Sequence, residues 1–323
     1  MRYFLSLLAA CGVSVLFYLL LFGALVSRPL VVDQMSSLMD KKLAYADSTP
    51  HPKLFIVAGS NARFSHSCAV LEMALHRPCV NMGIAADVSL DWTFDLLRSR
   101  LAPGDLVYMP IEYDLYARTR VRMMTGMDAA YRFRHDKRSL LSRGAEGMTR
   151  AAFMFSLPTL VQSGGEMALA AAGIERRFNL DTMDPQGDEI GHDGASAAAY
   201  REMIARAPEV LPDTKDILAN PDGAQQTIAD FLEWARAHHV TAVGGLPTIF
   251  DDRPVPAATI AALTGFYARH GAAFLVLANR SQYPRADFYD TGYHLRQSTQ
   301  RRHSALLAKA LAGLLPRPLS PTR

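Results

Sequence analysis

The stretch Leu54-Phe55-Ile56-Val57-Ala58-Gly59-Ser60-Asn61 decides the fold that this sequence predicts. Its first five residues are apolar, as in a buried strand of a parallel sheet, and they run directly into Gly59 and Ser60. A serine that follows such a strand lies at the carboxyl end of the sheet, where open α/β sheets bind their ligands. Ser60 is therefore a candidate nucleophile. The alternative is that Ser60 caps the following helix, which is the more common role for a serine in this local pattern.

The same apolar strand pattern recurs along the chain, and helical patterns separate its copies. The sequence predicts strands at 53–58, 79–82, 105–109, 240–244 and 272–278. It predicts helices at 62–76, 89–100, 225–238, 257–270 and 295–314. Strands that alternate with helical crossovers predict a three-layer α/β/α domain with a mostly parallel sheet.

The N-terminus carries a long apolar segment. Residues 4–26 contain no charged side chain, and a helix of this length reaches about 34 Å, enough to cross a hydrocarbon core about 30 Å thick. We therefore expect residues 1–27 to form a transmembrane anchor. A cleaved signal peptide is the alternative, although its apolar region usually spans only about 7 to 15 residues. The charges on either side of the segment predict a cytoplasmic N-terminus and an exported body.

The rest of the chain divides by composition. Residues 28–52 are polar and end in a segment with Pro50 and Pro52, which predicts a stalk. Residues 53–315 form the predicted α/β domain, with a helical insertion at about 118–222, and residues 316–323 form a flexible tail. The uncharged run at 151–165 is too short for a second span, so the insertion folds over the sheet or lies against a membrane surface or a partner.

Several classes of function lack support in the composition. A net charge of +3 over 323 residues is too small to indicate a nucleic-acid partner. The sequence contains no P-loop, dinucleotide fingerprint or zinc-ligand spacing, so we expect neither a cofactor nor a metal. Cys68 and Cys79 fall in the exported part, where they form either a disulfide or two small buried side chains.

A second chemical motif lies near the C-terminus, in Phe288-Tyr289-Asp290-Thr291-Gly292-Tyr293-His294-Leu295. A serine needs a base to take its proton and a carboxylate to orient that base, and His294 and Asp290 supply these two groups. The loop follows the last predicted strand, so the sheet can bring it to the edge that carries Ser60. Taken alone, Asp290 and His294 are more commonly helix-capping residues before Leu295.

In the order and spacing of these motifs, the exported part resembles the SGNH (GDSL-like) hydrolase superfamily, which has a flavodoxin-like fold. The resemblance implies that Ser60 is the nucleophile and that Asp290 and His294 complete the triad. The segment Val80-Asn81-Met82-Gly83-Ile84 matches the second block, which implies an oxyanion hole made by the amides of Gly83 and Ser60. The last block has one extra residue between Asp290 and His294. Either Gly292 absorbs it as a bulge, or Asp287 is the orienting acid.

The third block departs from the family, because Pro110-Ile111-Glu112-Tyr113-Asp114 stands in place of Gly-x-Asn-Asp. Asn61, Glu112 and Tyr113 are candidate substrate-binding residues. An N-terminal anchor with a serine-containing first block and a late Tyr-His-Leu block resembles the membrane-linked branch of the superfamily. That branch includes proteins of bacterial polysaccharide O-acetylation and of D-alanyl transfer to teichoic acid.

This resemblance implies a serine acyltransferase or esterase at the bacterial inner membrane, with its catalytic domain in the periplasm. Its substrate would be the O-acyl groups, above all O-acetyl groups, of an exopolysaccharide or envelope polymer. The implied partner is a multi-span acyltransferase or a polysaccharide synthase complex. Two alternatives are open: a deacetylase or thioesterase with the same triad, and a non-catalytic glycan-binding or scaffold protein of an export complex. The altered third block and the longer Asp–His spacing favour the latter.

Overall fold

The computed structural model describes residues 2–25, 30–85, 88–119, 131–132, 138, 141, 144–153, 157–174 and 182–314. The chain forms two compact units. The first, which we call the helical unit, comprises Met1–Ser37 and Met124–Asn179, and the second, the α/β unit, comprises Leu38–Met123 and Leu180–Arg323. The helical unit contains α1 (Arg2–Leu25), α9 (Gly144–Phe153) and α10 (Leu157–Ala171). Helix α1 is long and apolar enough to cross a membrane, as an anchor or a signal sequence would be.

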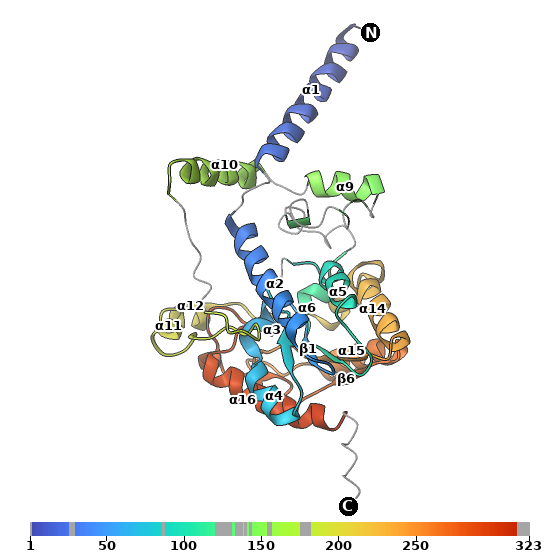
Figure 1. Ribbon diagram of the computed structural model, residues 1–323, viewed down its shortest axis with the longest axis vertical. Coiled ribbons are helices and arrows are strands. Elements are labelled where there is room, and N and C mark those ends of the chain that lie inside the picture. Colours follow the sequence, from blue (N-terminus) through green and yellow to red (C-terminus); the bar gives the residue numbers. More distant parts are fainter. Residues whose placement is uncertain are drawn as a thin grey trace, which may run out of the picture. The chain divides into compact units, whose positions relative to one another are not determined.

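The α/β unit is built on a parallel five-stranded sheet (Figure 1), which confirms the predicted fold class. The strands are β1 (Leu54–Ile56), β2 (Cys79–Asn81), β3 (Leu106–Met109), β4 (Thr241–Gly245) and β6 (Ala273–Leu275), in the order β2-β1-β3-β4-β6. The chain leaves β1 toward β2 on one side and then returns to β3 on the other. A crevice opens at such a switch point, beyond the carboxyl ends of the two central strands.

Helices cover both faces of the sheet. Leu54, Ile56 and Val243 share a buried cluster with α4 (Cys68–Leu75) and α16 (Gln297–Ala312). On the opposite face, α14 (Gln226–Ala237) packs on β4, α5 (Leu90–Arg98) packs on α14, and α15 (Ala257–Arg269) packs on β6. The remaining elements are α3 (Ser60–Ser65), α6 (Tyr113–Tyr116), α11 (Gly194–Ala198), α12 (Arg201–Arg206), α13 (Thr214–Ile217), η2 (Pro221–Gln225), η3 (Arg285–Asp287) and the parallel pair β5 (Ile249–Phe250) with β7 (Gln282–Tyr283).

The helix predicted at 62–76 is interrupted in the structure. It forms α3 and α4, and between them His66 adopts an extended conformation with φ −124° and ψ 140°. The amide of Ser67 donates to Ser304 Oγ of α16 at 2.7 Å. The break is stabilised by contacts with α16, a distant part of the sequence, so the local helical pattern does not predict it.

The segment predicted as a stalk is a helix, α2 (Leu30–Ser48). From Leu38 onward it belongs to the α/β unit, where Leu38 and Met39 are buried. Lys42 is also buried, and its Nζ donates to the carbonyl oxygens of Asn81, at 2.7 Å, and Gly187. The two prolines after Ser48 do not prevent this helix but follow its end.

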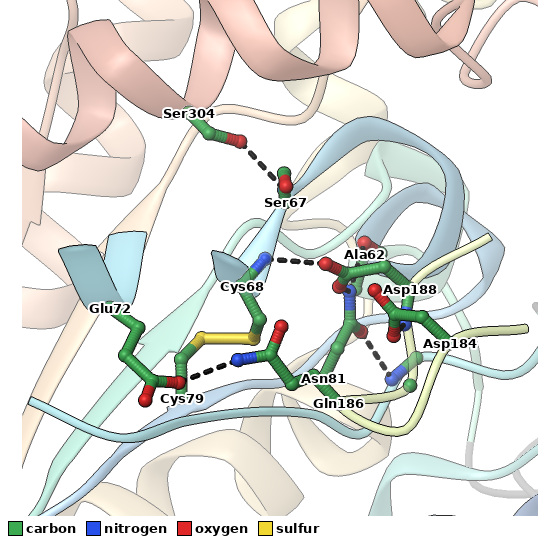
Figure 2. Close-up of a disulfide and its surroundings, with 12 residues drawn as sticks. Ala62, Ser67, Cys68, Glu72, Cys79, Asn81, Asp184, Gln186, Asp188 and Ser304 are labelled. Carbon is green, nitrogen blue, oxygen red and sulfur yellow. Dashed lines mark hydrogen bonds between the residues drawn. A yellow bond between two sulfur atoms is a disulfide. The ribbon is translucent and has the colours of Figure 1, made fainter. Parts of the chain in front are cut away.

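Of the insertion predicted at 118–222, the part from Leu180 onward belongs to the α/β unit. Asp188 accepts hydrogen bonds from the amide of Cys68 at 2.5 Å and from Asn81 Nδ2 at 2.8 Å (Figure 2). These two hydrogen bonds to the buried Asp188 side chain hold the segment around Asp188 against β2 and α4. The tail predicted at 316–323 lies outside the described residues.

Cys68 and Cys79 form a disulfide between the start of α4 and β2 (Figure 2). Of the two interpretations left open by the sequence, the structure has the disulfide. A disulfide together with an N-terminal apolar helix is consistent with an extracytoplasmic domain.

Replacing both Cys68 and Cys79 by alanine should lower the free energy of unfolding by about 2 to 4 kcal/mol, because the cross-link restricts the unfolded chain. Denaturant unfolding of the purified protein measures this change. Non-reducing peptide mapping provides the control and should find the two cysteines linked. Free thiols at both positions in protein taken from an oxidising compartment would contradict the assignment.

Candidate functional site

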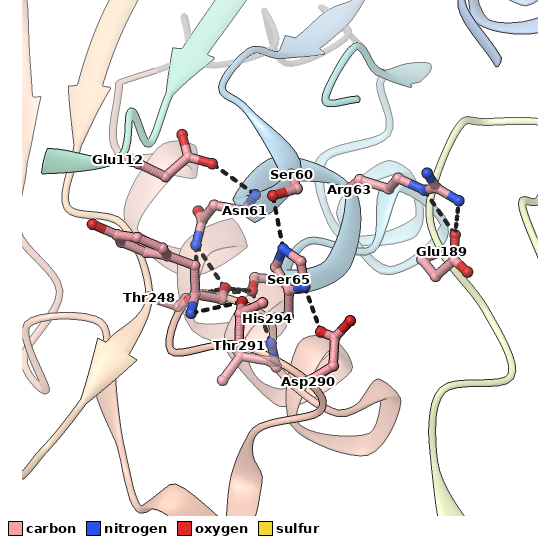
Figure 3. A network of polar contacts seen from close by, with 12 residues as sticks. Ser60, Asn61, Arg63, Ser65, Glu112, Glu189, Thr248, Asp290, Thr291 and His294 are labelled. Carbon is pink, nitrogen blue, oxygen red and sulfur yellow. Dashed lines mark hydrogen bonds and ion pairs between the residues drawn. The ribbon is translucent and has the colours of Figure 1, made fainter. Parts of the chain in front are cut away.

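Ser60 is the first residue of α3, at the carboxyl end of β1 and beside the switch point of the sheet. The N-cap residue of α3 is Gly59 and not Ser60. The hydroxyl of Ser60 instead lies 2.7 Å from His294 Nε2 (Figure 3). The helix-capping alternative for Ser60 therefore does not describe this structure.

His294 also contacts Asp290. Its Nδ1 lies 2.6 Å from Asp290 Oδ1, and the imidazole side chain is nearly buried whereas the carboxylate is partly exposed. An ionised carboxylate only accepts hydrogen bonds, so the neutral imidazole carries its proton on Nδ1 and leaves Nε2 to accept the Ser60 proton. The three residues thus form the continuous chain of hydrogen bonds that general-base activation of a serine requires.

The loop accommodates the extra residue between Asp290 and His294. Phe288 and Leu295 form an antiparallel bridge, and the amide of Tyr289 donates to the carbonyl of His294 at 2.8 Å. Gly292 lies so close to its neighbours that an added Cβ would come within 2.9 Å of Val210. Asp287, the alternative acid, pairs with Arg302 at 2.9 Å. Of these two aspartates, Asp290 is therefore the one that is placed to orient His294.

The carbonyl of Tyr293 anchors this loop to the nucleophile helix. It accepts hydrogen bonds from Asn61 Nδ2 at 2.9 Å and from Ser65 Oγ at 2.8 Å. Thr248 Oγ1, just beyond β4, lies 2.8 Å from the same carbonyl, and Ser65 Oγ also accepts from the amide of Leu295. Sequence reasoning missed Ser65 and Thr248, because neither stands in a recognisable motif and their shared partner is a backbone atom.

Glu112 holds the turn that carries Ser60. One carboxylate oxygen accepts a hydrogen bond from the amide of Asn61 at 2.8 Å (Figure 3). The other accepts from the amide of Gly59 at 2.9 Å, on the opposite side of Ser60. The side chain is only 1% exposed. Burial raises the pKa of Glu112 to about 7, although the hydrogen bonds from the two amides favour its ionised form.

The three candidate substrate-binding residues are all buried. Asn61 and Tyr113 have no exposed surface, and Glu112 has almost none. Asn61 and Glu112 make their hydrogen bonds within the protein, to the Tyr293 carbonyl and to the nucleophile turn. Asn61 and Glu112 therefore support the nucleophile turn, and a substrate-binding role for the three residues stays a prediction.

Gly83 lies against the nucleophile turn, as the second block implies. An added Cβ would come within 2.5 Å of Ala62 Cβ and 2.7 Å of the Gly59 carbonyl oxygen, so a side chain there would displace the turn. The amide of Gly83 donates to Asn81 Oδ1 at 3.0 Å. Its role as an oxyanion donor stays a prediction and requires that this amide turn from Asn81 toward the substrate or share its hydrogen.

Aromatic rings surround the imidazole. Phe64 stacks on His294 with ring centroids 4.1 Å apart and planes 10° apart. Tyr289 stacks on Phe64 in turn, and His192 meets both rings edge-on. Burial lowers the pKa of His192 to about 4, so this second imidazole is neutral at physiological pH. Neutral rings on the face of His294 restrict its orientation without competing for its proton.

Among the described residues, no group of three or more His, Cys, Asp or Glu side chains is placed to hold a metal ion. No protein-family model matches the chain, and a search of the curated proteins finds no match either. We therefore infer the function from the geometry around Ser60.

Glu112→Gln should reduce the rate at which Ser60 reacts with a fluorophosphonate probe by about 10- to 100-fold. A carboxamide has one acceptor oxygen, so one of the two amides beside Ser60 would face an NH₂ group, and a displacement of about 1 Å costs on the order of 100-fold in rate. Asp114→Asn removes the same charge from a neighbouring exposed position and is the matched control. Equal rates in the two variants would contradict the positioning role of Glu112.

The same variant should change how stability depends on pH. The folded chain holds the Glu112 proton up to a pKa of about 7, whereas the unfolded chain releases it near 4.5. Between these values the folded state binds more protons, so Glu112 makes the free energy of unfolding fall as the pH rises, by about 3 kcal/mol in total. The stability difference between the native protein and Glu112→Gln should shrink by that amount from pH 4.5 to pH 8. A difference that stays constant would show that Glu112 ionises normally.

Proposed function

We propose that this protein is a membrane-anchored, extracytoplasmic serine acyltransferase or esterase that acts on O-acyl groups of a bacterial exopolysaccharide or envelope polymer. The observation that carries the proposal is the chain of hydrogen bonds from Ser60 through His294 to Asp290. The order of the motifs, which resembles the SGNH superfamily, supports the choice of acyl chemistry. The apolar helix α1 and the Cys68–Cys79 disulfide support a site outside the cytoplasm.

In the proposed reaction, Ser60 Oγ attacks the acyl carbonyl carbon while His294 Nε2 takes the hydroxyl proton. The tetrahedral intermediate then collapses, the bond to the leaving oxygen breaks, and His294 returns the proton to that oxygen. A second hydroxyl, from water in an esterase or from a sugar in a transferase, gives its proton to His294 and attacks the acyl-enzyme. Ser60 leaves with that proton, and the enzyme is regenerated.

Acetyl transfer to a polymer would require a supply of acetyl groups from across the membrane. A multi-span acyltransferase or a polysaccharide synthase complex is the proposed partner for that supply. The N-terminal helix would hold the site at the membrane surface where such a partner and a growing polymer meet. The proposed location is the bacterial inner membrane, with the α/β unit in the periplasm.

A non-catalytic glycan-binding or scaffold role is the second candidate. The observation that favours it is the Gly83 amide, which donates to Asn81 and is not free for an oxyanion. A protein of this kind would keep the fold but would not form an acyl-enzyme. Covalent labelling separates the two candidates, because only the enzyme activates Ser60.

A fluorophosphonate probe should label the native full-length protein in detergent, and Ser60→Ala should abolish the labelling. Asp290→Asn should slow it by about 100-fold or more, because the imidazole loses the partner that orients it. Asp287→Asn is the matched control and should label normally, since Asp287 pairs with Arg302. Labelling that does not depend on Ser60, or the absence of labelling in the native protein, would exclude the serine enzyme and leave the binding role.

A further inference from the structure

Helix α10 of the helical unit has an exposed face that is apolar. Val161 is 67% and Leu169 is 37% exposed, and they lie two helical turns apart on one face, with exposed Gly165 between them. The exposed polar side chain nearest to that face is Gln162, whose Nε2 donates to Glu166 at 3.1 Å. Water is an unfavourable neighbour for the apolar face, so the face requires another environment.

The opposite side of α10 contacts the end of α1. Leu160 is buried, and an added Cβ at Gly164 would lie 3.7 Å from Leu25 Cδ2. Leu25 is the last residue of the apolar segment Tyr3–Leu25. If that segment crosses a membrane, then the middle of α10 lies at the level where the anchor leaves the hydrocarbon core.

Helix α9 reaches deeper along the anchor. The rings of Phe153 and Tyr18 stack with centroids 5.1 Å apart, and Tyr18 Oη donates to the carbonyl of Ala152 at 2.9 Å. Tyr18 precedes Leu25 by seven residues, which is about 10 Å along a helix. The C-terminal end of α9 therefore lies at a level inside the core, on the side where α1 ends.

The hydrogen bond has the chemistry expected at such a depth. A hydroxyl in hydrocarbon needs a protein partner because no water is available, and the last carbonyls of a helix lack partners within the helix. The donation from Tyr18 to Ala152 satisfies one group of each kind. Phe153 remains 50% exposed beside it, so an apolar ring continues the surface of the anchor.

From this continuity we infer that the C-terminal end of α9 and helix α10 are embedded in the outer leaflet beside α1, with the Val161–Leu169 face of α10 in contact with lipid acyl chains. The occupant of this face is the bilayer itself and not a protein partner. The inference rests on the membrane anchor of the proposed function and adds a second attachment, which would limit how far the chain beyond α1 can move from the membrane.

Depth-dependent fluorescence quenching in lipid vesicles tests the inference. The full-length chain with Cys11→Ser carries a single environment-sensitive fluorophore on Val161→Cys, and a second protein carries it on Ala237→Cys, the control at an exposed position of α14 in the α/β unit. Both positions are exposed, so labelling there leaves the packing intact. A third protein is labelled on the native Cys11, the free thiol in α1, and reports insertion of the anchor.

We expect spin-labelled acyl chains to quench the fluorophore at position 161 at least about threefold more than the one at position 237, with a blue-shifted emission at 161. The fluorophore on Cys11 should also be quenched. Quenching at Cys11 with equal, weak quenching at 161 and 237 would overturn the inference and leave a protein partner as the occupant. An unquenched fluorophore on Cys11 would also overturn the inference, because it would show that α1 does not insert into the membrane.

Discussion

The hydrogen bond between Ser60 Oγ and His294 Nε2 joins residues that are 234 positions apart, and most features of the α/β unit contribute to holding its two ends in place. Ser60 is presented by β1 and α3, near the middle of the sheet. His294 comes from a loop that leaves the far edge after β6 and returns over the carboxyl ends of the strands before α16 begins. The Tyr293 carbonyl, held by Asn61 and Ser65, ties that loop to α3 one residue before the imidazole.

Several of the groups that hold the two ends are ionisable and buried, and burying such a group costs free energy of desolvation. Glu112 is buried behind the nucleophile turn, and burial raises its pKa to about 7. Burial also raises the pKa of Asp188 and lowers the pKa of Lys42, two groups that pack around Asn81 behind the second block. Perturbed titratable groups gather at functional sites because a rigid, dry surrounding is needed to orient reacting atoms. Glu112 contacts the nucleophile turn and Asp188 contacts Asn81 beside it, where an active serine would require fixed surroundings.

Much of this arrangement could be predicted from the sequence, because its signals are local. The apolar runs at β1, β3 and β4 each mark a buried strand, and the alternation with helices leaves a parallel sheet as the simple solution. Ser60 and His294 were found because residue type and position agree: each follows a strand at the same edge of the sheet. The apolar segment of α1 was predicted from length and charge alone.

The parts that sequence could not predict depend on contacts between distant residues. The polar face of α2 gave no sign that Lys42 would be buried against Asn81 and Gly187. The sequence predicted Glu112 near the site but not its role as the acceptor for two backbone amides. Every residue except proline has such an amide, so no sequence pattern marks the two that Glu112 binds. The choice of Asp290 over Asp287 also needed the structure, since only their different partners, His294 and Arg302, separate two nearby aspartates.

Acylation of Ser60 can be measured directly by rapid-quench mass spectrometry of the protein mixed with an activated acetyl ester. We expect the acetyl group to accumulate within the first turnover on the peptide that carries Ser60 and to disappear as product forms. An acetyl group found only on other residues, or no acetylated peptide although unreacted ester is still present, would contradict the acylation of Ser60.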